Sequence, residues 1–117
     1  MKKVLLDENL PRQLAGFFSS KVSVTSVPDL GWQSKKNGEL LSAMESEGIE
    51  ILITADRNLR FQQNLKKFSV LVVVIKTFDV RLKALAGSVS KIEKVILENN
   101  GEEQVIEVDL LQEDPFQ

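Results

Sequence analysis

The sequence predicts an α/β fold, a three-layer α/β/α domain around a mostly parallel sheet of about five strands. Short apolar runs rich in β-branched residues alternate along the chain with stretches in which apolar residues recur every three or four positions. Strands that alternate with helices form right-handed βαβ units, whose strands lie parallel in one sheet. The runs predicted as strands are residues 4–6, 22–25, 49–53, 70–75 and 104–108.

The fourth and fifth runs differ in pattern. Residues 70–75 are continuously apolar, which is typical of a central parallel strand covered on both faces. Residues 104–108 alternate between polar and apolar side chains, which favours a strand at the edge of the sheet.

Helices are predicted between the strands. Leu10, Leu14, Phe17 and Phe18 recur at helical spacing, and Pro11 suits the first position of that helix. The first helix should therefore follow directly on the first strand.

Two further helices are expected. Leu40, Leu41 and Met44 mark the second, with Asn37 as its N-cap. The last is long, and the sequence ENNG at residues 98–101 ends it. Its apolar residues are Leu82, Leu85, Val89, Ile92 and Ile96.

Size and hydrophobic content predict the domain organisation. The chain has 117 residues, of which 43% are hydrophobic, which is enough for one domain with its own core. We expect that domain over residues 1–110 and an acidic C-terminal tail over residues 111–117. No apolar run approaches the roughly 18 residues of a membrane span, so we expect a cytoplasmic protein with no membrane partner.

Two absent residue types exclude several chemistries. The chain has no His and no Cys, so Ser-His-Asp and Cys-His catalysis, disulfides and thiolate or imidazole metal sites are excluded. The formal net charge of −2 gives no overall field that would attract nucleic acid. Any such partner would need a local basic patch.

Acidic residues follow the first three predicted strands. Asp7 and Asp56 come after the first and third, Asp29 comes a short loop after the second, and Glu39 lies at the start of the second helix. The carboxyl ends of parallel strands share one edge of the sheet, where ligand sites form. Clustered carboxylates favour a bound cation, and oxygen ligands alone favour Mg²⁺ or Mn²⁺ over zinc.

Each of these acids also has a structural explanation. Asp7 and Asp56 could cap the turns that follow them, and Asp29 could shape the turn PDLG. Glu39 would be stabilised by the helix dipole without any metal. Their shared place at the strand ends is what favours a metal site.

Basic residues surround this predicted edge. Arg12 follows the first acid, Lys36 precedes Glu39, and Arg57 and Arg60 follow Asp56. Positive side chains around an acidic centre suit the binding of an RNA backbone, although they could equally be solvated helix surfaces. Two aromatic residues are candidate stacking partners for bases: Phe61 is better explained as core, whereas Trp32 fits either role.

Three segments, in this order, resemble the small PIN-like proteins, a compact bacterial branch of the PIN-domain superfamily. The segments are VLLDENLP, DLGW with KKNGELL, and ILITADRNLRFQQN followed by an apolar strand, and the resemblance covers roughly residues 3–76. It implies a Mg²⁺- or Mn²⁺-dependent endoribonuclease that cleaves RNA by metal-activated water, in many relatives the toxin of a toxin–antitoxin pair.

The resemblance also implies roles for individual residues. Asp7, Glu39 and Asp56 take the places of the catalytic metal ligands, and Asp29 is a further candidate ligand without a counterpart in the family. Asn58 stands where many relatives carry another acid. The partners that the resemblance allows are RNA, an antitoxin protein and a second copy of the chain.

Two other function classes fit parts of the pattern. Because Asn58 removes one acid, a non-catalytic PIN-like module that binds RNA or protein is the main alternative. A phosphoreceiver domain also has acids after its first and third strands. It needs a hydroxyl residue at the end of the fourth strand and a lysine at the end of the fifth, where this chain has Lys76 and Asp109.

Overall fold

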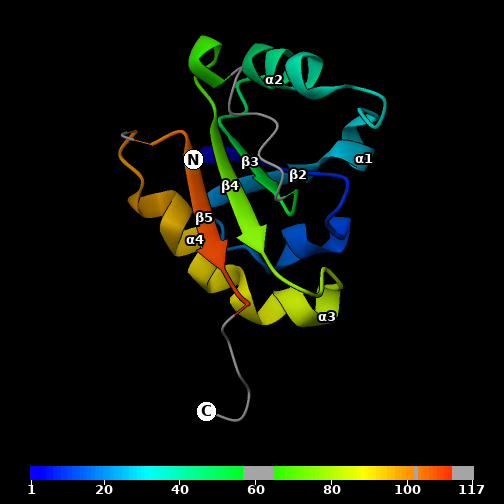
Figure 1. The fold of residues 1–117 in the computed structure, drawn as a ribbon, viewed down its shortest axis with the longest axis vertical. Helices are drawn as coiled ribbons and strands as arrows, with labels where there is room; N and C mark the ends of the chain where they lie inside the picture. Colours follow the sequence, from blue (N-terminus) through cyan, green and yellow to red (C-terminus); the bar gives the residue numbers. More distant parts are fainter. Residues whose placement is uncertain (57–64, 102, 112–117) are drawn as a thin grey trace.

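The computed structural model describes residues 1–56, 65–101 and 103–111 (Figure 1). Five strands form one sheet in the order β2-β1-β3-β4-β5, and every neighbouring pair is parallel. The prediction of a parallel five-stranded sheet is confirmed, each strand within two residues of its expected bounds. The strands are β1 (Lys2–Leu6), β2 (Val22–Ser26), β3 (Ile51–Thr54), β4 (Leu71–Lys76) and β5 (Val105–Asp109).

Two apolar clusters cover the two faces of the sheet, because successive side chains of a strand point to opposite faces. In β4, Leu71, Val73 and Ile75 belong to one cluster, and Val72 and Val74 belong to the other. The first face packs against the 3₁₀ helix η1 (Arg12–Phe17), α3 (Leu82–Leu85) and α4 (Val89–Glu98), and the second against α2 (Asn37–Ser46). The predicted three-layer α/β/α fold is confirmed.

The predicted positions of the fourth and fifth strands in the sheet are also confirmed. β4 lies between β3 and β5 and is buried along all but its last residue. β5 is an edge strand in which Val108 alone is fully buried. Continuous apolarity and alternation therefore distinguished an interior strand from an edge strand in this sheet.

The first predicted helix is shorter and tighter than expected. It is the 3₁₀ helix η1, and Pro11 precedes it instead of occupying its first position. Bonds from Leu14 N to Pro11 O (3.0 Å) and from Phe18 N to Ala15 O (3.3 Å) close three-residue turns. Leu14 is buried, whereas Phe17 is 53% exposed, so only part of the predicted apolar stripe reaches the core.

The second helix begins one residue earlier than predicted. Leu40 N donates to Lys36 O (2.7 Å), so the first turn closes on Lys36, and Asn37 is the first helical residue. The assignment of Asn37 as the N-cap is therefore wrong.

The last predicted helix is interrupted. A 3₁₀ turn, η3 (Ala86–Ser88), separates α3 from α4, and Gly87 within it has low helix propensity. The helix does end at Glu98, at the start of ENNG as predicted. The other short helices are α1 (Val27–Leu30) and the 3₁₀ helix η2 (Leu65–Lys67).

Two further expectations concern membrane-spanning helices and the C-terminal tail. Within the described ranges, the helices are too short or too polar to cross a membrane. Of the predicted tail, Leu111 is described, and residues 112–117 lie outside the described part of the chain.

Candidate functional site

The strand order places a topological switch point between β1 and β3. β1 pairs with β2 on one side and with β3 on the other, so the connections after β1 and β3 leave toward opposite sides of the sheet. In open α/β sheets, ligands bind at the carboxyl ends of the strands beside such a point. The two segments that meet there begin with Asp7, after β1, and Ala55, after β3.

The Thr54 hydroxyl is the centre of a hydrogen-bond network at this point. Thr54 is fully buried at the end of β3, and its Oγ1 donates to Asp7 Oδ2 (2.7 Å). The same oxygen accepts from Asn9 Nδ2 (3.2 Å) and from the amide of Asp56 (3.0 Å). One donated and two accepted bonds use the full capacity of a hydroxyl group.

Asp7 is held by backbone bonds as well. Its amide donates to Ile53 O (2.9 Å), which continues the ladder between β1 and β3 by one residue. Its Oδ1 accepts from the amide of Glu8 (2.8 Å). Both carboxylate oxygens are therefore oriented, while the side chain stays half-buried and reachable from solvent.

Asn9 joins the two segments a second time. Its Oδ1 accepts from the amide of Ala55 (3.2 Å), while its Nδ2 donates to Thr54. The segment after β1 is thus fixed to the segment after β3 through Asp7 and through Asn9. This arrangement brings Asp7 and the backbone of Asp56 to one hydroxyl group.

Asp29 and Arg12 lie together, apart from this network. Asp29 is in the first turn of α1, where its amide donates to Ser26 Oγ (3.2 Å). Its carboxylate accepts from Arg12 Nη1 at 3.2 Å, and both side chains are largely exposed. The predicted RNA-binding arginine and the additional candidate ligand therefore pair with each other, in a contact of the kind that contributes about 1 kcal/mol or less.

The segment around Asp29 is also more regular than the turn that PDLG suggests. It forms the single helical turn α1, which ends at Gly31 with φ of +71°. Glycine adopts this left-handed conformation without the strain that a Cβ atom would bring.

Glu39 and Lys36 lie at the start of α2. Glu39 is exposed in the first helical turn, and Lys36 is the exposed N-cap. Within the ranges that the structure describes, no group of three or more carboxylates is close enough to hold a metal ion. The network joins the Asp7 carboxylate to the backbone amide of Asp56 through Thr54.

Several predicted residues fall outside the described part of the chain. These are Arg57, Arg60, Asn58 and Phe61. Trp32 is described, and it packs half-buried against the apolar cluster under α2, with Lys35 Nζ 5.8 Å from the centre of its ring. Packing and a cation–π contact account for this tryptophan.

The turn after β4 is closed by its own side chains. Thr77 Oγ1 donates to Asp79 O (3.1 Å) and accepts from the amide of Asp79 (3.2 Å). Asp79 in turn accepts from the amide of Arg81 (3.0 Å) and from its guanidinium at 2.7–3.1 Å. Residues 77–81 therefore form a hydrogen-bonded turn at the carboxyl edge of the sheet.

This turn gives a prediction for pH. Hydrogen bonds from the Arg81 side chain and amide lower the pKa of Asp79 from 3.8 to about 2. A depressed pKa means that the pairing is complete above the ordinary value near 3.8 and is lost as the pH falls through about 2. We expect the Asp79 carboxyl carbon, followed by NMR, to titrate near pH 2. In Arg81→Gln it should titrate closer to pH 4, and an unchanged midpoint would contradict the pairing.

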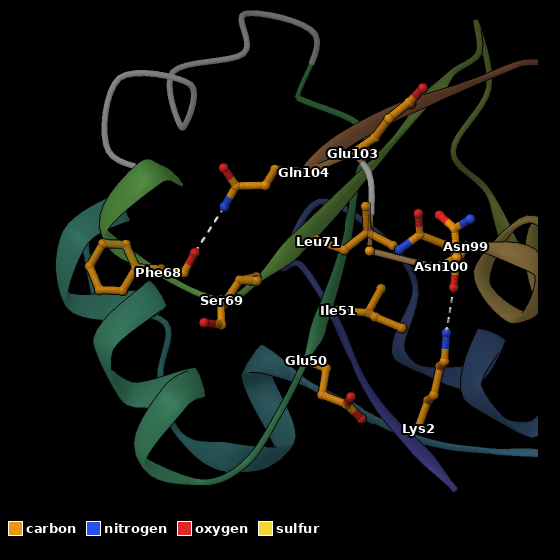
Figure 2. Close-up of a pocket in the computed structure, with 12 residues that line it drawn as sticks. Lys2, Glu50, Ile51, Phe68, Ser69, Leu71, Asn99, Asn100, Glu103 and Gln104 are labelled. Carbon is orange, nitrogen blue, oxygen red and sulfur yellow. Dashed lines mark hydrogen bonds between the residues drawn. The ribbon is translucent and has the colours of Figure 1, made fainter.

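A cavity lies at the opposite edge of the sheet (Figure 2). It has a volume of about 730 Å³ and adjoins Ile51 and Leu71, the first residues of β3 and β4. Lys2 Nζ donates there to Ile96 O (3.0 Å) and Asn99 O (3.3 Å), and Gln104 Nε2 donates to Phe68 O (2.8 Å). Lys2 and Gln104 thus hold the end of α4 and the segment after η2.

Thr54 and Asn9 were not predicted as site residues from the sequence. The available signal was the single polar residue that closes the run ILIT, next to a strand that ends on Asp7. No family model, curated protein or solved structure matches the chain, so the interpretation of the site depends on its own geometry.

Proposed function

We propose that the protein is a Mg²⁺- or Mn²⁺-dependent endoribonuclease of PIN-like type, with Asp7 and Asp56 as metal ligands. The observation that carries the proposal is the buried Thr54 hydroxyl, which bonds the Asp7 carboxylate and the Asp56 amide at the switch point of the sheet. The carboxyl ends of the strands beside such a point are where the α/β fold presents a ligand site.

The donor groups fit such an ion. Each oxygen of Asp7 accepts one described bond and keeps a further lone pair for a cation. Mg²⁺ is usually held by one or two carboxylates, with water and substrate phosphate completing its shell. Two acids therefore suffice, and the ion, when bound, would activate water and offset the charge of the phosphate.

The other candidate residues keep the roles predicted from the sequence. Glu39, exposed in the first turn of α2, is the third ligand that the family resemblance implies. Lys36, Arg57 and Arg60 are the side chains that would bind RNA phosphates, and Arg12 would join them by exchanging its surface pair with Asp29 for a phosphate. A toxin role, with a separate antitoxin protein, belongs to the same proposal.

Asp7→Asn and Asp56→Asn should each lower the cleavage of RNA in Mn²⁺ by more than about 100-fold. Loss of even an outer partner of a metal ligand costs about 10–100-fold, and a ligand should cost more. Cleavage of a 5′-labelled RNA in Mn²⁺, with EDTA as the metal-free reference, measures the effect. Thermal unfolding of each variant verifies that it is folded.

Asp109→Asn is the matched control. Asp109 is an exposed acid at the end of β5, on the same edge of the sheet, and its carboxylate only accepts from the amide of Leu111 (2.9 Å). This variant should cleave RNA at the wild-type rate. Protein that is inert on varied RNAs with Mn²⁺ would refute the enzyme, and equal losses in all three variants would refute the assignment of ligands.

Metal binding separates the enzyme from the non-catalytic module. An ion that binds only the native state raises the free energy of unfolding by about 2.7 kcal/mol at 100 times its Kd. We expect Mn²⁺ to raise the melting temperature of the wild type and not of Asp7→Asn. RNA binding without any metal-dependent shift would favour the module instead.

A further inference from the structure

Phe78 is the most exposed large aromatic side chain in the described ranges. It exposes 85% of its surface, although phenylalanine is usually buried. It lies two residues beyond the end of β4. Figure 1 shows that the chain turns toward α3 after this strand. This is the carboxyl edge of the sheet, the same edge that carries Asp7 and Thr54.

The backbone on both sides of Phe78 is fixed. Thr77 and Asp79 bond each other across it, and Asp79 is bonded in turn to the amide and guanidinium of Arg81. When a ligand covers the ring, only the two side-chain torsions of Phe78 have to be ordered, because the backbone is already fixed. The turn is therefore preorganised to present the ring to solvent.

Charged side chains lie near the ring in sequence. Residues 76–83 contain three cations, Lys76, Arg81 and Lys83. Lys76 lies 3.8 Å from Glu107, and Arg81 bonds Asp79 at 2.7 Å, in surface ion pairs with which a phosphate group can compete. Arg81 and Lys83 are exposed. An aromatic face beside lysine and arginine is the combination with which proteins bind single-stranded nucleic acid, since the ring stacks on a base and the cations attract the backbone.

The distance to the candidate site suits one RNA strand. β4 pairs directly with β3, with Val74 opposite Thr54. Phe78 is four residues past Val74, so its Cα lies no more than about 20 Å from that of Thr54. A few unpaired nucleotides would cover this span.

We propose that Phe78 is a stacking platform for an unpaired base of the RNA whose backbone passes Asp7 and Asp56. The proposal extends the ribonuclease function and rests on it for the identity of the ligand. It assigns the turn 77–81 to the binding of single-stranded RNA next to the site of cleavage.

The test is the affinity for a short fluorescein-labelled single-stranded RNA, measured by anisotropy in EDTA so that no cleavage occurs. Stacking contributes about 1–3 kcal/mol per base, so Phe78→Ala should weaken binding roughly 5- to 150-fold. Phe78→Trp should retain the affinity, whereas Phe78→Leu should lose it, because leucine fills space without an aromatic face.

Two controls make the test specific. Phe17→Ala removes another exposed phenylalanine, 53% exposed at the end of η1, and should leave the affinity unchanged. A duplex of the same sequence, whose bases are already stacked, should bind wild type and Phe78→Ala equally. Wild-type affinity of Phe78→Ala for the single strand, or an equal loss for strand and duplex, would overturn the platform.

Cleavage assays run in parallel keep the two proposals separate. Metal-dependent cleavage with unchanged single-strand affinity in Phe78→Ala would refute the platform and leave the nuclease standing. Single-strand binding that depends on Phe78 without any cleavage would support the platform and refute the nuclease. Absence of RNA binding by the wild type would overturn the platform and assign the exposed ring to a protein surface.

Discussion

Thr54→Val should lower the free energy of unfolding by about 1–3 kcal/mol. Valine has nearly the shape of threonine, so the core keeps its packing, but the Asp7 carboxylate, the Asn9 amide and the Asp56 backbone amide lose their common partner. A buried polar group left without its partner costs about 1–3 kcal/mol, and here three groups, two of them half-buried, lose one partner together. Urea denaturation followed by circular dichroism measures the change.

Thr54→Val should also reduce metal-dependent RNA cleavage, since the Asp7 carboxylate would no longer be held toward the segment that carries Asp56.

Two control variants accompany this test. Thr54→Ser keeps the hydroxyl and should retain most of the wild-type stability and cleavage. Thr25→Val is the matched control, because Thr25 lies half-buried on the edge strand β2, and it should change the stability by less than about 0.5 kcal/mol.

A double-mutant cycle tests the bond itself. If the Thr54 hydroxyl acts through Asp7, the effects of Thr54→Val and Asp7→Asn will not add, and their coupling should be about 0.5–3 kcal/mol. Additive losses would mean that the two side chains stabilise the fold independently. This result would contradict the Thr54–Asp7 hydrogen bond on which the proposed site depends.

The fold could be predicted because its determinants are local. Residues 70–75 show a buried strand by composition alone, and the alternation in residues 104–108 shows an edge. The order of the strands could not be predicted in this way, since it depends on the side of β1 to which each connection leads. No single segment of the sequence determines that direction, so the switch point between β1 and β3 is known only from the structure.

Helix details failed where local and tertiary preferences compete. Leu14 and Phe17 both fit a helical stripe, but of these two only Leu14 is buried in the core. The six residues of η1 form 3₁₀ turns instead of an α-helix. The break between α3 and α4 occurs at Gly87, in a stretch whose apolar spacing is uninterrupted. Apolar spacing shows which face is buried but not whether the helix is continuous.

Only the part of the site that local sequence reveals could be predicted. Asp7 stands out because a carboxylate ends an apolar strand, whereas Thr54 does not, since threonine is an ordinary strand residue and its partners are about 45 residues away in sequence. The pairing of Arg12 with Asp29 was equally hidden, because it depends on how η1 and α1 lie relative to each other.

Ile96→Ala should lower the free energy of unfolding by about 2–5 kcal/mol, the largest loss we expect from one substitution. Ile96 is fully buried in α4 and belongs to the cluster that joins this helix to one face of the sheet. Truncation removes buried methyl groups and leaves a cavity that a well-packed core fills only in part. The midpoint of urea denaturation should fall with little change in the slope.

Leu97→Ala is the control on the same helix. Leu97 follows Ile96 directly but is 37% exposed, because neighbouring helical residues point about 100° apart. Its truncation should cost less than about 1 kcal/mol, and equal losses for the two variants would mean that α4 packs through a different face.

The Ile96 variant also separates stability from activity. The backbone carbonyl of Ile96 accepts from the side chain of Lys2, the first residue of β1, at the edge of the sheet opposite Asp7. Folded Ile96→Ala should therefore cleave and bind RNA like the wild type well below its melting temperature. Thr54→Val should lose cleavage at the same temperature, because its lost hydrogen bonds lie in the site itself. If both variants lost activity in proportion to their stability, the Thr54 network would have only a structural role.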